Sequence, residues 1–198
     1  MGDAGVVAGR SGRAGISTAS ASAHDLAITG LILSVAGSAW FGWGRQDPPS
    51  GWSIPLLIGS VVGLGVAVAG GLLLRRLLSS GESAMNDPRI RRSWRLIVGV
   101  EVVAILLGNV LLGLSGRPAY AAAWTLFVVG AHFLPMARVF RMPGIGVAGV
   151  VLMAVAVGAA VVAVAGLAAP SAVAGLGGGL VCVVSGAMYL RRAYRHDA

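Results

Sequence analysis

Two ionisable side chains, Glu101 and His132, stand inside long apolar segments of the sequence. These segments flank a short loop centred on Arg117, so they predict an antiparallel hairpin in which residues equally far from the loop lie level. Glu101 lies 16 residues before Arg117 and His132 lies 15 after it, while Asn109 and Trp124 lie 8 before and 7 after. An unpaired charge in lipid costs about 2.5–3.5 kcal/mol on insertion scales. We therefore expect Glu101 and His132 to face each other, with rotation about the two helix axes left open.

These residue types allow two interpretations. In the first, Glu101 and His132 carry a proton or bind a ligand at a cavity, because intramembrane ionisable residues commonly mark ion or substrate pathways. Asn109 and Trp124 would line the same cavity further out. In the second, the pair is a hydrogen bond that locks the hairpin, and Trp124 serves packing alone. Pro135 either kinks the fourth helix, because proline removes a backbone hydrogen bond, or marks the point where that helix leaves the membrane.

No other arrangement of residues in the sequence indicates chemistry. The single cysteine, Cys182, has no evident base as a partner, and no cluster of cysteine and histidine has the spacing of a metal site. The glycine-rich stretch 175–179 is not followed by lysine, as a phosphate-binding loop would require. We therefore predict no enzymatic activity, no cofactor and no metal.

The composition indicates a membrane protein of the all-α class. The chain is 57% hydrophobic and 11% charged over 198 residues, whereas soluble domains are about one quarter charged. Crossing a bilayer takes about 20 consecutive apolar residues in a helix, and β-barrel strands would alternate in polarity over pieces of about 10 residues. The apolar runs are continuous and long, which favours a bundle of six transmembrane helices. The predicted spans are 26–44, 54–74, 96–115, 119–137, 144–168 and 171–190.

The positive charges predict an orientation. The net charge of +8 comes from arginine alone, because the chain has no lysine. With six spans, 13 of the 15 arginines fall on the side of the two termini, and Arg45 and Arg117 fall on the other side. Cytoplasmic loops are enriched in positive residues, so both termini are predicted to be cytoplasmic. Orientation explains the arginines better than nucleic-acid binding does. Arginine-rich, lysine-free usage also suggests a GC-rich bacterium, and hence a multi-pass protein of the cell membrane.

The segments outside the spans carry further predictions. Residues 1–25 are rich in Gly, Ala and Ser and are predicted to be a disordered cytoplasmic tail, while 191–198 form a cytoplasmic C-terminal tail. The apolar run from Leu26 is interpreted as a retained signal anchor. Gly81 is a plausible end for the second helix. Asp87 followed by Pro88 predicts a helix start about two turns before the third span.

The third helix would thus begin with a basic cytoplasmic projection. Its charges are either a signal for orientation or a contact for anionic lipid headgroups. The arginines concerned are Arg89, Arg91, Arg92 and Arg95.

Small residues recur at helix-contact spacing. Gly59 and Gly63 form one pair, and Gly175 and Gly179 form another. Pairs of this kind allow two helices to approach closely in a membrane. The sequence shows no convincing match between its two halves, so an inverted repeat of three helices is not predicted.

The stretch 129–135, Val-Gly-Ala-His-Phe-Leu-Pro, resembles a segment found in a family of small uncharacterised bacterial multi-pass membrane proteins. That segment has the form Gly-Ala-His-(Phe or Leu)-Leu-Pro. The similarity extends to Asp25–Ala27 before the first span, with Gly30 and Trp40 following. It implies a helical membrane domain with a His-Pro pair in the fourth span, and it implies no activity.

The sequence alone leaves the biochemical role open between three classes. A membrane enzyme ranks third, because it needs several polar residues that converge at one interface and the sequence offers few. The leading hypothesis is an integral membrane protein with an accessory or structural role, in contact with the lipid bilayer and with a membrane-protein partner or a second copy of itself. The alternative is a small secondary transporter or proton-coupled permease that uses Glu101 and His132. The transporter requires a water-accessible cavity that reaches Glu101, and the structural role does not.

Overall fold

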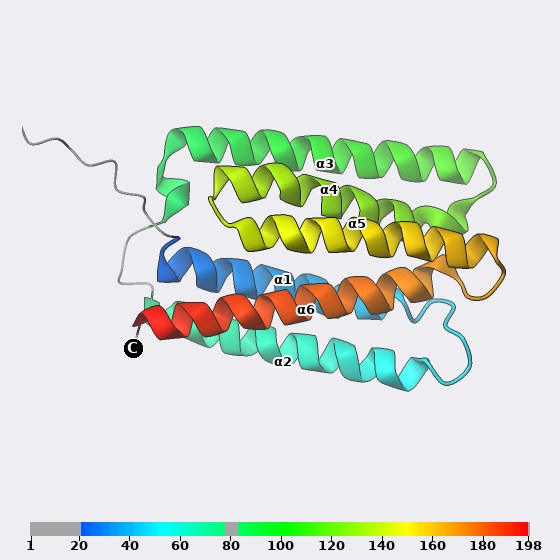
Figure 1. Ribbon diagram of the computed structural model, residues 1–198, viewed down its shortest axis with the longest axis horizontal. Coiled ribbons are helices and arrows are strands. Elements are labelled where there is room, and N and C mark those ends of the chain that lie inside the picture. The colour runs from blue at the N-terminus through cyan, green and yellow to red at the C-terminus, as the bar shows by residue number, and fades with distance from the viewer. Residues whose placement is uncertain (1–20, 78–82, 198) are drawn as a thin grey trace, which may run out of the picture.

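A computed structural model describes residues 21–77 and 83–197 of the chain, and it consists of six long helices packed side by side (Figure 1). No strand occurs among these residues. Two short 3-10 turns, η2 (Ala84–Asn86) and η3 (Pro118–Tyr120), precede the third and fourth helices. All six helices are long and apolar enough to cross a membrane, which confirms the predicted all-helical class. The helices are α1 (Ala23–Trp43), α2 (Ser53–Leu77), α3 (Pro88–Leu114), α4 (Ala121–Val139), α5 (Pro143–Val164) and α6 (Pro170–Asp197).

Consecutive helices run in opposite directions, because every connection between them is short compared with the helices (Figure 1). Helix α1 packs against α6 and α2, α5 packs against α4 and α6, and α3 lies at the edge of the bundle against α4. We call the end where α1 begins and α6 ends the basic end. The opposite end, where α3 meets α4 and α5 meets α6, is the distal end.

The predicted glycine pairs lie at helix contacts. The ring of Phe41 on α1 is packed between two glycines, and a Cβ atom at either would lie 2.7 Å from it: Gly59 on α2 and Gly179 on α6. Gly63 faces the backbone of α1, and Gly175 lies against the last residues of that helix. The close approach of α1, α2 and α6 therefore depends on the absence of side chains at these positions.

Two serines join α1 to α2 through reciprocal hydrogen bonds. The hydroxyl of Ser38 donates to the backbone carbonyl of Ser60 at 2.8 Å, and the hydroxyl of Ser60 donates to the carbonyl of Ser38 at 3.1 Å. In lipid, hydrogen bonds between helices supplement van der Waals packing as a cause of association. This contact was not predicted from the sequence.

The helix ends follow their capping residues. Asp87 accepts a hydrogen bond from the backbone amide of Arg89 at 2.7 Å, and Pro88 is the first residue of α3, as predicted. Ser22 caps α1 by accepting a bond from the amide of Asp25, so the helix begins at Ala23 and the predicted tail ends earlier than residue 25. Helix α6 continues through the predicted C-terminal tail to Asp197. The rest of the N-terminal tail and Gly81 lie outside the described residues.

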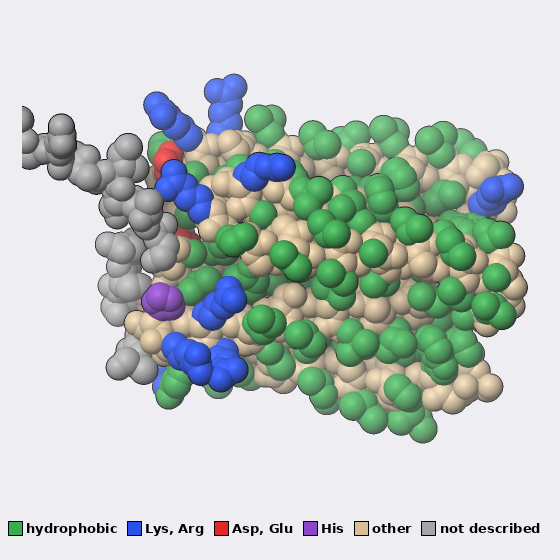
Figure 2. Space-filling view, in the orientation of Figure 1, with side chains coloured by type: hydrophobic (Ala, Val, Ile, Leu, Met, Phe, Trp, Pro, Cys, Tyr) green, Lys and Arg blue, Asp and Glu red, His purple; other side chains and the backbone are tan. Residues whose placement is uncertain are grey.

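The arginines of the described residues divide unequally between the two ends. Arg45 and Arg117 lie in loops at the distal end, while the others gather at or near the basic end (Figure 2). The middle of the bundle presents mainly hydrophobic side chains in this view. The molecule thus has an apolar belt with one strongly basic end. The arginines of the basic end are Arg75, Arg76, Arg89, Arg91, Arg92, Arg95, Arg138, Arg141, Arg191, Arg192 and Arg195.

Candidate functional site

Helix α3 is attached to the bundle on one side only. None of its residues is buried, and it packs mainly against α4 and the two 3-10 turns. Most of its large apolar side chains point outward, with Val100 69% exposed and Leu111 65% exposed. A helix with this surface is suited to lipid on its outer face. Its inner face carries the residues singled out in the sequence.

Glu101 and His132 meet between α3 and α4. Oε1 of Glu101 lies 2.9 Å from Nδ1 of His132, and the two side chains are 14% and 13% exposed. The predicted pairing across the hairpin is therefore confirmed. A carboxylate oxygen and an imidazole nitrogen both accept hydrogen bonds unless one of them carries a proton. At this distance, the pair needs a proton to become a hydrogen bond.

Packing of α4 on α5 fixes the position of His132. Gly130 of α4 lies against the backbone of Gly149 on α5, so the two helices approach closely just before the histidine. The imidazole also meets the ring of Phe133 edge-on, with 4.7 Å between the ring centroids. Pro135 lies inside α4, which continues to Val139, so the proline does not end the helix.

Asn109 and Trp124 lie on the same hairpin, but neither bonds to Glu101 or His132. The amide nitrogen of Asn109 donates to the hydroxyl of Thr125 at 3.3 Å, and the indole nitrogen of Trp124 donates to the carbonyl of Ala104 at 3.1 Å. The indole crosses α3 at Gly108, where a Cβ atom would overlap it. Because Gly108 has no side chain, the indole of Trp124 can lie against α3 at this point, and it bonds to Ala104 and not to Asn109. Thr125 was missed, although it lies 8 residues after Arg117, as Asn109 lies 8 before it.

A cavity of about 490 Å³ lies between α1 and the hairpin of α3 and α4, and Glu101 and His132 form part of its wall. We call it the hairpin cavity. Along α1 it extends from Asp25 to Trp40, a distance of about 22 Å at 1.5 Å per residue. Its volume falls within the range of about 300–1,000 Å³ typical of small-molecule sites.

Only two of the four polar residues singled out in the sequence, Glu101 and His132, line this cavity. Neither Asn109 nor Trp124 belongs to its lining, so the prediction that they line the same cavity as Glu101 is wrong. Trp124 lines a smaller recess of about 350 Å³ nearer the distal end. Asn109 lies eight residues after Glu101 on α3, and Trp124 lies eight residues before His132 on α4. Eight residues correspond to about 80° around a helix, so Asn109 and Trp124 point away from the cavity that Glu101 and His132 line.

Asp25 closes the basic end of the hairpin cavity through two hydrogen bonds. Its Oδ1 accepts from the hydroxyl of Ser83 at 2.9 Å, and its Oδ2 accepts from the backbone amide of Ala84 at 2.9 Å. The carboxylate on α1 thereby holds η2, the turn that leads into α3. Nothing in the sequence marked this contact, which joins residues 58 and 59 positions apart.

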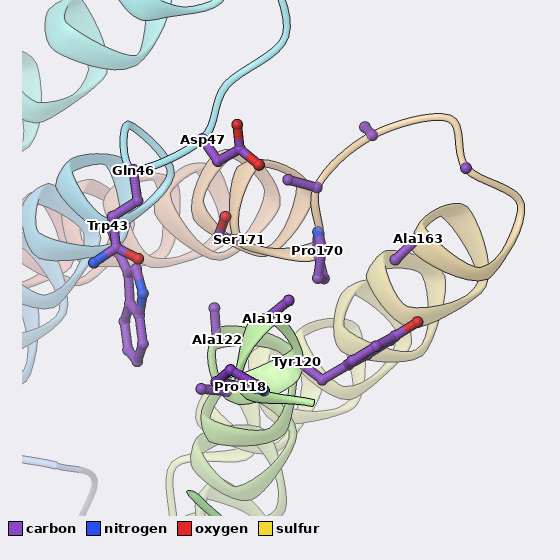
Figure 3. A pocket seen from close by; sticks show the side chains of 14 residues that line it. Trp43, Gln46, Asp47, Pro118, Ala119, Tyr120, Ala122, Ala163, Pro170 and Ser171 are labelled. Atoms are coloured by element: carbon purple, nitrogen blue, oxygen red, sulfur yellow. The ribbon is translucent and has the colours of Figure 1, made fainter. Parts of the chain in front are cut away.

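A second cavity, of about 730 Å³, opens at the distal end, and we call it the distal cavity (Figure 3). Gln46 and Asp47 from the α1–α2 connection, Tyr120 before α4 and Ser171 on α6 lie around it. Trp43 lines this cavity.

The indole of Trp43 stacks on that of Trp40, with 5.2 Å between the centroids and 8° between the planes. Because Trp40 lines the hairpin cavity, the stacked pair contributes to the walls of both cavities.

The remaining predictions concern lipid and metal. The arginines at the start of α3 are exposed, and their contact with lipid headgroups stays a prediction; they are Arg89, Arg91, Arg92 and Arg95. Within residues 21–77 and 83–197, no three His, Cys, Asp or Glu side chains are grouped to hold a metal ion. Comparison of this chain with protein-family models, with curated proteins and with solved structures gave no match.

Proposed function

We propose that this protein is a small proton-coupled secondary transporter of the cell membrane. The observation that carries the proposal is the hairpin cavity, whose wall includes Glu101 and His132. A pair that only locked a hairpin would need no cavity beside it. A pair that exchanges protons during transport needs a cavity that reaches it, and the hairpin cavity reaches both Glu101 and His132.

The chemistry follows from the geometry of the pair. With one added proton the pair carries no net charge, either as an imidazolium facing a carboxylate or as a carboxylic acid facing a neutral imidazole. Loss of that proton leaves a carboxylate facing a neutral imidazole, which keeps the hydrogen bond only as its Nδ1–H tautomer. Each proton gained or lost therefore changes both the charge of the cavity wall and the attraction between α3 and α4. Because α3 buries no residue, few other contacts oppose its movement. Proton exchange and a change in cavity access are coupled in this way.

The arginine distribution supports an orientation with the basic end in the cytoplasm. The hairpin cavity then extends from the cytoplasmic end, and the distal cavity faces the outside. Alkaline phosphatase fused after Arg117 should be active, and the same enzyme fused after Ala198 should be inactive. The opposite pattern would reverse the orientation.

An accessory or structural role is the competing proposal, and one observation favours it. Glu101 and His132 join α3 to α4 where α3 has no buried residue, so the pair could serve attachment alone. Both proposals expect Glu101→Gln to insert and fold, because glutamine keeps the size and an acceptor oxygen. Only the transporter expects the variant to lose proton movement.

Proton flux into proteoliposomes tests the proposal. Vesicles containing the full chain and the pH dye pyranine would carry an imposed pH gradient. They would then receive an apolar cation, an apolar anion, a zwitterion or a neutral sugar, with protein-free vesicles as the blank. At least one solute should move protons ten times faster with the wild type than with Glu101→Gln. Asp47→Asn, a carboxylate change in the distal cavity, is the matched control and should behave as wild type. Equal rates in wild type and Glu101→Gln for all four solutes would refute the transporter.

A further inference from the structure

We propose that the ligand of the hairpin cavity is an elongated apolar organic cation, which takes the place of the proton at Glu101. This inference rests on the proposed function and names its substrate class. Four properties of the cavity carry it: the sign of its charges, the availability of one carboxylate, the nature of its apolar wall and its shape.

The ionisable side chains in the cavity wall are the carboxylates of Asp25 and Glu101, the imidazole of His132 and the thiol of Cys182. No arginine belongs to the described lining, although arginine is the commonest charged residue of the chain. An anionic solute would find only His132 as a cationic partner, and that imidazole already faces a carboxylate. Burying a charge is costly without a partner of opposite sign. The cavity therefore favours a positive charge over a negative one.

Of the two carboxylates, Glu101 is the one available to a ligand. Both oxygens of Asp25 accept hydrogen bonds from η2, through Ser83 and Ala84. The close contact of Glu101 uses Oε1, and the part of the chain that the structure describes provides no recorded partner for Oε2. A cation bound at this oxygen would sit in the middle section of the cavity, between α1 and α3.

The remaining wall suits the body of such a cation. It combines aromatic rings, which attract cations through their π-faces, with methionine thioethers, which adapt to ligands of varied shape. The cavity is also long, because it follows α1 for about four turns. These features favour a flat or elongated aromatic body over a compact polar one. The side chains concerned are Trp40, Trp94, Phe133, Phe140, Met85, Met136 and Met142.

Cation and proton exclude each other at this site. A protonated Glu101 is neutral and offers a cation no charge, and a bound cation disfavours a proton at the same carboxylate. Binding of one cation therefore releases the proton, and binding of the proton releases the cation. The charge of the site is the same in both states, so the exchange strands no net charge in the membrane. The result is antiport of a cation against a proton.

Three solutes of one shape isolate the effect of charge. They are 1-methyl-4-phenylpyridinium, its neutral isostere 4-methylbiphenyl and the anion biphenyl-4-carboxylate. Binding of each to the full chain in lipid nanodiscs would be measured over a series of pH values, with empty nanodiscs subtracted. The cation should bind saturably, and its binding should weaken as the proton concentration rises. Glu101→Gln should weaken cation binding at least tenfold, whereas Asp47→Asn should leave it unchanged. A thermal unfolding curve for each variant verifies folding.

The outcomes separate this inference from the proposed function. If the anion or the neutral isostere binds as tightly as the cation, or if Glu101→Gln binds the cation like wild type, the substrate class is wrong. If the anion alone drives Glu101-dependent proton flux in vesicles, the transporter stands and the cation is refuted. If the cation binds through Glu101 but moves no protons, the ligand class stands and transport falls.

Discussion

Helices α1, α2 and α6 differ from α3 in how they pack. The first three approach one another through glycines and enclose Phe41, which is 3% exposed, between them. Helix α3 buries nothing and leaves a cavity of about 490 Å³ between its hairpin and α1. The close packing and the ionisable pair therefore occupy separate parts of the bundle. One part provides a fixed frame, and the other provides space and a proton-binding pair.

The close packing of α1, α2 and α6 is tested most strongly at Phe41. Phe41→Ala should lower the free energy of unfolding by about 3 kcal/mol, because the glycines on both sides have no side chain to fill the space. Phe127→Ala on α4 is the control, since that ring is 38% exposed and should cost far less. Unfolding in mixed micelles would measure both. Equal losses for the two variants would contradict the close packing of α1, α2 and α6 around Phe41.

The attachment of α3 at the basic end is tested at Asp25. Asp25→Leu removes both acceptors and leaves the amide of Ala84 without its partner, a loss of about 1–2 kcal/mol. Hydrogen exchange at Ala84 should become at least tenfold faster, while exchange within α6 should stay unchanged. Asp47→Leu at the distal end is the matched control. Unchanged exchange at Ala84 in Asp25→Leu would show that other contacts hold η2.

The polar contacts nearer the distal end should contribute least. A double-mutant cycle with Asn109→Leu and Thr125→Val should give a coupling of about 0.6 kcal/mol, typical of hydrogen bonds between membrane helices. A second cycle, with Asn109→Leu and Trp124→Phe, should give coupling near zero, because Trp124 bonds to Ala104 instead. Coupling in the second cycle and none in the first would contradict the hydrogen bonds of Asn109 with Thr125 and of Trp124 with Ala104.

The sequence predicted the features that depend on chain order and length. Six apolar runs, the Asp87–Pro88 start of α3 and the level positions of Glu101 and His132 follow from local composition and a short loop. Rotation about a helix axis depends on tertiary packing, which is why the prediction that Asn109 and Trp124 line the same cavity as Glu101 was wrong. The small residue opposite the indole, Gly108, was the signal that could have corrected this.

Contacts between distant segments could not be predicted from local pattern. The bonds from Ser83 and Ala84 to Asp25 join segments that the chain alone does not bring together. The cavities have the same origin, because a space between helices depends on all the side chains around it. The glycine pairs were identified by spacing, but their partner, Phe41, follows only from the fold.

In the proposed transporter, the pair of Glu101 and His132 exchanges protons with the hairpin cavity. Nitrogen NMR of protein labelled at histidine tests it directly, because the chain has only three histidines. Substituting His24 and His196 would assign the signal of His132. Its ring N–H should exchange protons with water, and Glu101→Gln should slow that exchange. A His132 N–H that exchanges no protons with water would identify a sealed structural pair and contradict proton exchange through the hairpin cavity.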